Sequence, residues 1–213
     1  MRAVFNRLHR FDRNIRQEGG FCGDMAGVDE VGIGPLAGPV VAAAVIFIRK
    51  FDAPGLNDSK KVPSKIREKL FWQIAKHSIV GLGVVSELEI DSINIYQAGR
   101  LAMRRALLSL SRTPDYILVD GKARIDIPLP QKTIIEGDAK SACIAAASII
   151  AKVYRDAWMT HLDSIYPGYQ FKKHKGYSTP LHLEIIRSKG PSVVHRKSFA
   201  PVREALEKMP VLA

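Results

Sequence analysis

The chain has 213 residues, a 46% hydrophobic content and a formal net charge of +11, which suits one globular domain, or a core domain with an appendage, and excludes wholesale disorder. Its longest largely apolar stretch, PLAGPVVAAAVIFI, is interrupted by Gly and Pro and is shorter than the ~20 residues that cross a membrane. Its two cysteines, Cys22 and Cys143, stand far apart and away from any His cluster, which argues against a disulfide framework or zinc site and fits a cytoplasmic protein.

Residues 1–24 are strongly charged and include Gly19 and Gly20, so we expect a flexible basic N-terminal arm with at most a short turn of helix. Residues 26–32 are short, apolar and bounded by glycine, which predicts a strand. Residues 38–48 are apolar on both faces and predict a central strand. The Gly- and Pro-rich piece between the two predicts a hairpin.

Further along the chain, the spacing of apolar residues alternates between helical and strand patterns. Ile66, Leu70 and Ile74 indicate a helix over residues 63–77, with Ser64 as its N-cap. The remaining pattern predicts strands at 78–87, 115–121 and 131–138, an amphipathic helix at 94–110, and a long central helix at 139–162. This order predicts an α/β fold in which helices flank a mixed sheet.

From about residue 165 the chain becomes rich in Lys, His, Pro and Tyr, with at most short helices. We therefore divide it into the arm at 1–24, a core at 25–164, and a C-terminal basic segment at 165–213 that packs on the core. The net positive charge favours a polyanionic partner, chiefly nucleic acid or an anionic membrane surface, although many soluble proteins are basic without such a partner.

Asp29 and Glu30 are adjacent carboxylates inside the apolar segment AGVDEVG. In the ordinary explanation, one acid caps a turn and the other faces solvent. Burying both would be costly without a cation or strong hydrogen-bond donors. Neighbouring side chains of a strand point to opposite faces, so these two converge on one site only if the strand ends or bulges there, which Gly32 would allow.

Asp120 ends the apolar run YILVDG, and Asp138 lies directly before the long predicted helix. Taken alone, Asp120 suits a turn and Asp138 suits the N-cap of that helix. Together with Asp29 and Glu30, they gather acids at strand ends, where sites form in open α/β sheets. Carboxylates without His or Cys suit Mg²⁺ or Mn²⁺, and an acidic metal pocket in a basic protein is typical of a phosphodiester nuclease.

The segment GIGPLAG has the glycines of a nucleotide-binding loop but not its context. A dinucleotide loop leads from a strand into a helix, whereas this segment leads through Pro35 into a predicted strand. No Gly-Lys-Ser/Thr follows, so a Walker loop is excluded as well. What remains is a backbone that can approach a ligand closely because side chains are missing.

Six segments in order resemble bacterial ribonuclease HII over about residues 22–204: GVDEVGIGPLAGPV, LNDSKKV, ILVDG, EGDAKSACIAAASIIAKVYRD, HKGYST and GPSVVHRKSFAPV. The resemblance implies a ribonuclease H-like fold, with a mixed five-stranded sheet flanked by helices and a C-terminal helical segment. It implies that residues 25–164 are the catalytic core and that residues 165–213 bind substrate. It implies an endonuclease that cuts the RNA strand of RNA/DNA hybrids. It also implies incision 5′ of a single ribonucleotide embedded in duplex DNA, leaving 3′-hydroxyl and 5′-phosphate ends.

Matched motif by motif, the resemblance implies one metal site. It places two divalent ions, Mg²⁺ or Mn²⁺, among four carboxylates, those of Asp29, Glu30, Asp120 and Asp138. One ion would be held by Asp29 and Asp138, and the other by Asp29, Glu30 and Asp120.

The resemblance also implies how the substrate is read. Gly32, Ile33 and Gly34 take the place of the family's Gly-Arg-Gly, whose backbone reads the ribose 2′-hydroxyl. Tyr177 takes the place of the tyrosine that stacks on the sugar beside the junction. Ile33 departs from the pattern, because most relatives carry Arg there, and this removes a charged side chain near the phosphates.

Four lysines are candidate phosphate contacts, although a solvated surface lysine is the ordinary explanation for each: Lys60, Lys140, Lys152 and Lys175. Lys152 differs from the others because it lies in an otherwise apolar helix and needs an anionic partner. The histidines at 174, 182 and 195 are not arranged as a nucleophile or zinc set. We therefore assign them no catalysis.

Three other classes of protein fit the sequence less well than the ribonuclease HII family that it resembles. Ribonuclease HIII usually carries an extra N-terminal substrate-binding domain, which the short arm cannot hold, and the basic C-terminal block argues against a junction resolvase. A basic RNA-binding protein of the ribosomal type would not explain four acids at strand ends. We expect a monomer that binds RNA/DNA hybrids and ribonucleotide-containing duplex DNA, with no membrane association; the sequence is silent on a replication clamp.

Overall fold

A mixed five-stranded sheet, in the order β3-β2-β1-β4-β5, forms the centre of the computed structural model, which describes residues 2–20, 22–48, 53 and 55–208. The strands are β1 (Met25–Val31), β2 (Val40–Phe47), β3 (Ser78–Val85), β4 (Tyr116–Asp120) and β5 (Gln131–Ile134). β1 pairs antiparallel with β2 and parallel with β4. The predicted strands and the hairpin between β1 and β2 are confirmed.

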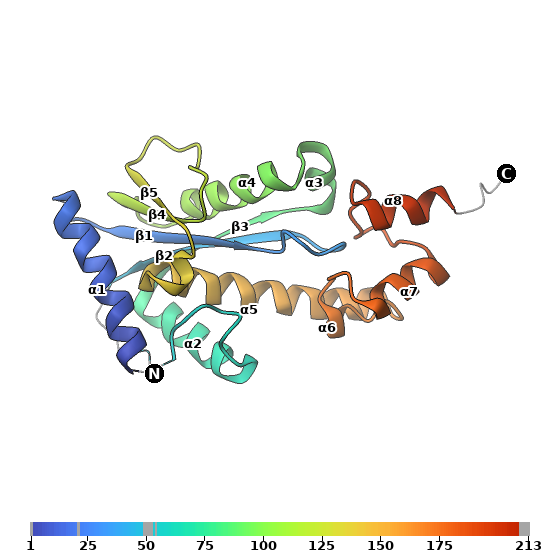
Figure 1. Cartoon of the computed structure of the whole chain (residues 1–213), viewed down its shortest axis with the longest axis horizontal. Helices are drawn as coiled ribbons and strands as arrows, with labels where there is room; N and C mark the ends of the chain where they lie inside the picture. The colour runs from blue at the N-terminus through green and yellow to red at the C-terminus, as the bar shows by residue number, and fades with distance from the viewer. Residues whose placement is uncertain (1, 21, 49–52, 54, 209–213) are drawn as a thin grey trace.

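Helices cover both faces of the sheet and gather at its two ends (Figure 1). They are α1 (Arg2–Gly19), α2 (Ser64–His77), α3 (Glu87–Ile93), α4 (Ile95–Leu108), α5 (Ala142–Ile165), α6 (Phe171–His174), α7 (Pro180–Lys189) and α8 (Ala200–Glu207), with a 3₁₀ turn η1 at Gly137–Ala139. α4 packs on one face against β1, β2 and β3, and α5 packs on the other against β1 and β2. The predicted α/β fold with helices on both faces is confirmed.

β2 is apolar on both faces because each face contributes to a separate core. Val41 and Val45 pack in a cluster with residues of α2 and α5. Ala42 and Ala44 point the other way, into a cluster with residues of α4. The strand is buried along almost its whole length, so it has no polar positions.

The start of α5 lies directly against β1. A Cβ on Gly27 would come 2.2 Å from the backbone carbonyl carbon of Cys143, so only glycine fits at this position. The following alanines of α5 are fully buried in the core, and Cys143 is a buried free thiol as predicted. This close approach brings the N-terminus of α5 to the middle of the sheet.

The predicted cap of α2 is wrong, and the alternative in which Asp138 caps α5 is excluded. Asp138 does not cap α5, because it lies in η1 and the side chain of Ser141 accepts the cap hydrogen bond from the N–H of Ile144. Ser64 is the first helical residue of α2 rather than its cap, since Pro63 holds the N-cap position without a side-chain cap bond. Asp138 is therefore not committed to capping a helix.

The predicted flexible arm at residues 1–24 is replaced by a long helix, α1, over residues 2–19. Leu8, Asp12 and Ile15 recur at helical spacing and are buried, each 5% exposed or less, while Arg10 and Arg13 face solvent. The Oδ2 of Asp12 accepts a hydrogen bond of 3.1 Å from the N–H of Cys143 at the start of α5. The high charge of the segment hid this narrow buried face.

The C-terminal segment consists of short helices, as predicted, at the end of the molecule away from α1 (Figure 1). Its loops return to the hairpin between β1 and β2: the N–H of Leu36 donates to the carbonyl of Gly176 (2.7 Å), and the N–H of Gly38 donates to that of Val194 (2.9 Å). The segment therefore packs on the core. Within the described part of the chain, none of the helices has both the length and the apolar character needed to cross a bilayer.

Replacing Leu8 by Ala tests whether α1 is docked in solution. We expect a loss of roughly 2–5 kcal/mol in the free energy of unfolding, because a buried leucine is truncated, measured by urea denaturation. Asn14→Ala, on the exposed side of the same helix, is the matched control and should change stability by about 0.5 kcal/mol or less. Equal effects of the two substitutions would show that the helix is not packed.

Candidate active site

Four acids lie where β1, β4 and the η1 turn meet. Asp29 and Glu30 belong to β1, Asp120 ends β4, and Asp138 lies in η1 just after β5. β1 and β4 run parallel with Val28 opposite Val119, so Asp29 and Asp120 are the next pair along the two strands. The predicted gathering of acids at strand ends is thus what the sheet topology produces.

The two acids of β1 point to opposite faces of the sheet. The Ser148 hydroxyl, on α5, hydrogen-bonds to Asp29, whereas Glu30 lies on the α4 side, where a Cβ on Gly99 would come 3.8 Å from its Cγ. The pairing of β1 with β2 continues without a break through both acids to Val31. Of the two alternatives that we expected, a strand end or a bulge, the structure shows the first: β1 ends at Val31, just before Gly32, and the acids meet around the end of β4.

Burial and mutual repulsion raise the pKa of three of these carboxyls. Asp29 is 6% exposed, and its pKa is raised well above the usual value, first by burial and then by Glu30 and Asp120. Burial and the charge of Asp120 raise the pKa of Glu30 to about 7. Burial, with Asp58 and Asp120, raises that of Asp138 to about 6. The positive charge that the protein places beside these carboxylates does not offset their burial and mutual repulsion.

Two neighbours belong to this cluster. Asp58, which we did not predict, shares a side-chain hydrogen bond with Asp138, and the motif LNDSKKV was the available signal for it. The positive charge of Lys60 lowers the pKa of both Glu30 and Asp138, so this candidate lysine does lie beside the acids. The Oδ1 of Asp120 accepts a hydrogen bond of 2.7 Å from the N–H of Gly137 and so ties β4 to η1.

The donor set fits a divalent cation. Carboxylate oxygens are hard ligands of the kind that Mg²⁺ and Mn²⁺ prefer, and a cation among them would relieve the repulsion that raises their pKa values. Among the described residues, however, no three His, Cys, Asp or Glu side chains are already placed to hold one ion between them. The backbone brings the acids together, and their side chains must rotate to share a ligand.

Two buried arginines, which the sequence patterns did not indicate, hold the loop that follows the acids. Arg155 of α5 donates to the carbonyls of Ala37 (3.1 Å) and Pro39 (3.0 Å). Arg196 donates to the carbonyls of Gly32 (2.6 Å), Ile33 (3.1 Å) and Gly38 (2.7 Å). Both side chains are fully buried, and burial lowers the pKa of Arg196 to about 9. The carbonyls of this loop are therefore turned inward.

The amides of the same loop are left available. None of the hydrogen bonds among the described residues uses the N–H groups of Gly32, Ile33 or Gly34 as donors. Gly32 has φ +99°, and a Cβ there would lie 2.5 Å from the Nε of Arg155, whereas Gly34 has open space around it. The loop thus presents unpaired backbone donors on a glycine surface.

Ile33 does not face outward as a charged residue would. Its Cδ1 lies 3.0 Å from the position of a Cβ on Gly99 of α4, and its side chain packs against the apolar cluster beneath α4. Ile33 therefore anchors the loop through its side chain. Its carbonyl, which accepts a hydrogen bond from Arg196, anchors the loop as well.

Tyr177 and two of the candidate lysines lie together beside α5. The ring of Tyr177 is 39% exposed, and its centroid is 5.9 Å from the Nζ of Lys152. Lys152 has the anionic partner that we predicted, Asp156, at 2.7 Å. The Nζ of Lys175 donates to the hydroxyl of Thr160 (2.8 Å), and burial lowers its pKa. These two amines are already engaged by α5.

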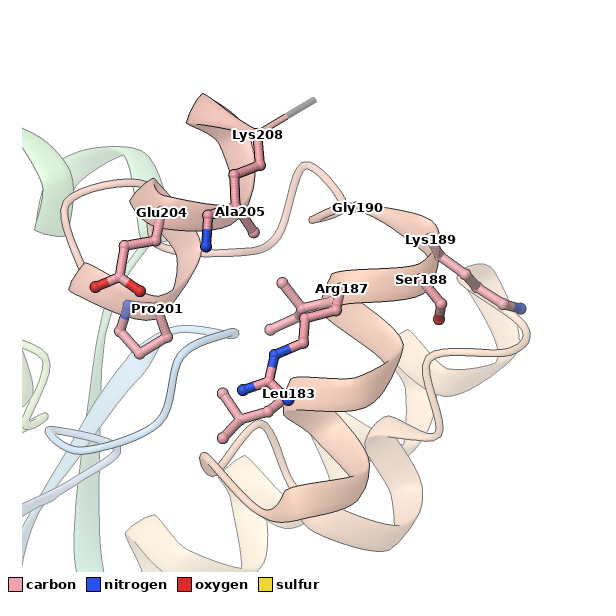
Figure 2. A pocket seen from close by; sticks show the side chains of 10 residues that line it. Leu183, Arg187, Ser188, Lys189, Gly190, Pro201, Glu204, Ala205 and Lys208 are labelled. Atoms are coloured by element: carbon pink, nitrogen blue, oxygen red, sulfur yellow. The ribbon is translucent and has the colours of Figure 1, made fainter. Parts of the chain in front are cut away.

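Lys140 lies apart from that group. It follows η1, is exposed, and its Nζ donates to the carbonyl of Ile135 at 2.7 Å. A separate cavity of about 460 Å³ between α7 and α8 is lined by Arg187, Lys189, Glu204 and Lys208 among others (Figure 2). None of the four acids lines this cavity, so it lies outside the candidate site.

Comparison with known proteins identifies the family. The family model for ribonuclease HII matches residues 26–202. The chain belongs to the ribonuclease HII family. A ribonuclease HII from Geobacillus kaustophilus is 52% identical over 204 residues, which are 95% of this chain and 77% of that protein. Membership makes the chain an endoribonuclease of the ribonuclease H type and excludes the junction resolvase and the ribosomal RNA-binding protein.

Solved structures support the ribonuclease H-like fold. The ribonuclease H2 from Pyrococcus horikoshii has a TM-score of 0.72 and 27% identity, covering 86% of this chain and 97% of that one. A Bst ribonuclease HIII, solved in complex with Mn²⁺, has a TM-score of 0.65 at 21% identity, covering 86% of this chain and 69% of that one, and shows the fold alone. The ribonuclease HII family is thus distinguished from ribonuclease HIII by sequence, not by fold.

The repulsion among the acids predicts a pH-dependent effect of Asp29→Asn on stability without divalent ions. Because the pKa of Asp29 is raised in the folded protein, the wild type loses stability as pH rises from the unfolded value of about 4 towards the folded one. The asparagine does not ionise, so we expect it to raise the melting temperature more at pH 8 than at pH 4.5.

The measurement is thermal unfolding in the presence of a chelator. Asp126→Asn, at an exposed acid, is the matched control and should show no such dependence. The same shift in melting temperature for Asp29→Asn at both pH values would contradict the electrostatic description of the site.

Proposed function

We propose that this ribonuclease HII hydrolyses the RNA strand of RNA/DNA hybrids and incises duplex DNA 5′ of a single embedded ribonucleotide. The products carry 3′-hydroxyl and 5′-phosphate ends, and the reaction uses two divalent ions, Mg²⁺ or Mn²⁺. The observation that carries the proposal is the meeting of four acids, Asp29, Glu30, Asp120 and Asp138, in a chain of net charge +11, where burial and mutual repulsion raise the pKa of Asp29, Glu30 and Asp138. The positive charge attracts the nucleic acid, and the acids would hold the divalent ions that its cleavage requires.

The reaction is an in-line displacement at phosphorus. A water oxygen forms the new bond to phosphorus, the bond from phosphorus to the 3′ oxygen breaks, and the 3′ oxygen leaves as a hydroxyl after gaining a proton. Bound metal ions supply Lewis-acid stabilisation of the attacking and leaving oxygens. Asp29 and Asp138 would hold the ion on the side of the water, and Asp29, Glu30 and Asp120 would hold the ion on the side of the leaving oxygen.

In this proposal the ribonucleotide is recognised by main-chain N–H groups and by the ring of Tyr177, and not by a charged side chain. The free N–H groups of Gly32, Ile33 and Gly34 are donors that a 2′-hydroxyl can accept from, and Arg196 holds the loop from behind through its carbonyls. Tyr177 offers an exposed aromatic face for stacking on the sugar beside the junction. Because the readout uses main-chain groups, Ile33 in place of arginine leaves it intact.

The four lysines take different parts in this proposal. Lys60, beside the acids, and Lys140, after η1, are the phosphate contacts we propose. Lys152 and Lys175 support α5 and the Tyr177 loop through their bonds to the side chain and carbonyl of Asp156. We further propose a cytoplasmic monomer whose partners are RNA/DNA hybrids and ribonucleotide-containing duplex DNA.

Asp29→Asn tests the metal site directly. On a DNA duplex with one ribonucleotide, with Mg²⁺ or Mn²⁺, we expect cleavage to fall by at least about 10³-fold, since removing a shared ligand weakens both ions, while binding of the hybrid is retained. Asp126→Asn should cut as the wild type does. A normal rate for Asp29→Asn removes this residue from the site, and an absence of metal-dependent nicking by the wild type favours a binding protein instead.

Tyr177→Ala tests the stacking role. We expect kcat/KM at a lone ribonucleotide to fall by about 10-fold or more, since stacking on one base or sugar contributes about 1–3 kcal/mol, with an unchanged melting temperature. Tyr177→Phe keeps the ring and should retain activity. An unaltered rate for the alanine variant would discard the assigned role.

A further inference from the structure

Three buried histidines lie together in the C-terminal segment, and the proposed chemistry uses none of them. His174, His182 and His195 are 6%, 0% and 1% exposed. The rings of His174 and His182 are stacked with centroids 4.0 Å apart, and the Nε2 atoms of His182 and His195 are 3.0 Å apart. Phe171 packs against all three rings.

The surrounding backbone determines which nitrogen of His195 and of His174 carries the proton. The N–H of Ser192 donates to Nδ1 of His195 at 2.9 Å, closer than the Ser192 carbonyl at 3.3 Å, so Nδ1 is an acceptor and Nε2 carries the hydrogen. The N–H of Gly176 donates to Nδ1 of His174, whose Nε2 donates to the carbonyl of Tyr169 at 2.7 Å. Both residues are therefore neutral Nε2–H tautomers.

His182 must take the opposite tautomer. Its Nδ1 lies 2.9 Å from the carbonyl oxygen of Tyr177, which can only accept, so Nδ1 carries the hydrogen. Its Nε2 is then free to accept from the Nε2–H of His195. A single directed chain of hydrogen bonds runs from Ser192 through His195 and His182 to the main chain of Tyr177.

Burial keeps this chain neutral. It lowers the pKa of His182 to about 4 and that of His195 to about 3. A proton added to His182 would also set two N–H groups against each other at the contact with His195. The direction of the hydrogen bonds is therefore the same throughout the neutral pH range.

The hydrogen-bonded histidines connect two segments of the chain, around Tyr177 and around His195. Both segments contact the loop between β1 and β2, residues 32–39. Gly176, next to Tyr177, accepts from the N–H of Leu36, and the N–H of Arg196, next to His195, donates to the carbonyl of Leu36 (2.9 Å). Ala37 also forms an isolated β-bridge with His195. The bond between His182 and His195 thus adds to the contacts that position Tyr177 relative to the loop, beside the bond from the N–H of Thr179 to the Tyr177 carbonyl (2.8 Å).

We propose that His182 and His195 are positioning residues, which hold the Tyr177 main chain by directed hydrogen bonds and so set the ring against the sugar at the ribonucleotide junction. This inference rests on the proposed role of Tyr177. The neutral histidines neither bind a metal nor exchange protons with the substrate. Their effect on the reaction passes through one carbonyl group, that of Tyr177.

Isosteric variants of His182 separate this role from simple filling of the core. An asparagine amide takes the place of Nδ1–H and can still donate to Tyr177, whereas a glutamine amide takes the place of Nε2 and cannot. We expect His182→Gln to lower kcat/KM at a lone ribonucleotide by about tenfold, which corresponds to the loss of one hydrogen bond. We expect His182→Asn to retain most of the wild-type kcat/KM. Equal losses in the two variants would overturn the proposal.

The same substitution in a Tyr177→Ala background completes the test. With the ring absent, His182→Gln should cause no further loss, whereas an undiminished tenfold loss there would show a role independent of Tyr177. If Tyr177→Ala by itself has no effect on cleavage, the proposed stacking function fails. The hydrogen-bond chain is then tested separately by NMR of the histidine rings. Melting temperatures of all variants identify any that unfold.

Nitrogen-15 NMR of the histidine rings reports the tautomers without any substrate. We expect His182 as the Nδ1–H form and His174 and His195 as Nε2–H forms at neutral pH. The exposed His161 of α5 is the control and should show a mixture of the two tautomers. An Nε2–H form of His182 would overturn the directed chain whatever the activity of the variants.

Discussion

Negative charge held out of water at the meeting of β1 and β4 is the constraint on which the rest of the structure depends. Asp29 is 6% exposed, and the charges of Glu30, Asp120 and Asp138 all raise its pKa. A carboxylate in such a place destabilises the fold unless a cation joins it. Other features fit this constraint: Lys60 lies beside the acids, Ser148 hydrogen-bonds to Asp29, and the chain carries a net charge of +11.

The loop after β1 depends instead on buried positive charge. Arg155 and Arg196 lie fully buried and direct their guanidinium N–H groups at main-chain carbonyls of the loop after β1. A planar guanidinium with several fixed donors suits this use better than an ammonium group. With the carbonyls turned inward, the N–H groups of Gly32 and Gly34 donate to none of the described residues, and in our proposal they bind the substrate together with Tyr177.

The local patterns of the sequence predicted much of this structure. The apolar run of β2, the hairpin, the long helix α5 and the four acids at strand ends all follow from periodicity and from the cost of burying charge. We expected Asp29 and Glu30 to meet only if their strand ends or bulges beside them, and the strand ends: β1 stops at Val31, and β4 stops beside the acids at Asp120. Only the pairing register reveals this.

What remained hidden depends on contacts between segments far apart in the chain. The buried face of α1 consists of Leu8, Asp12 and Ile15 among many charged residues, so composition suggested a loose arm. Arg155 lies in a helix and Arg196 in a basic block, where each resembles an ordinary surface cation. The carbonyls that they bind in the loop after β1 are 116 to 164 residues away, and no local pattern predicts a contact at such a separation.

The most direct test of the metal site is to locate the ions. Crystals of the wild-type protein soaked in Mn²⁺ would be measured at the manganese absorption edge, and anomalous difference density would mark the bound metal. We expect density among Asp29, Glu30, Asp120 and Asp138, with the side chains rotated towards it, and its loss in Asp29→Asn. Manganese bound elsewhere, with the four acids left without density, would contradict the central claim that these carboxylates form the catalytic metal site.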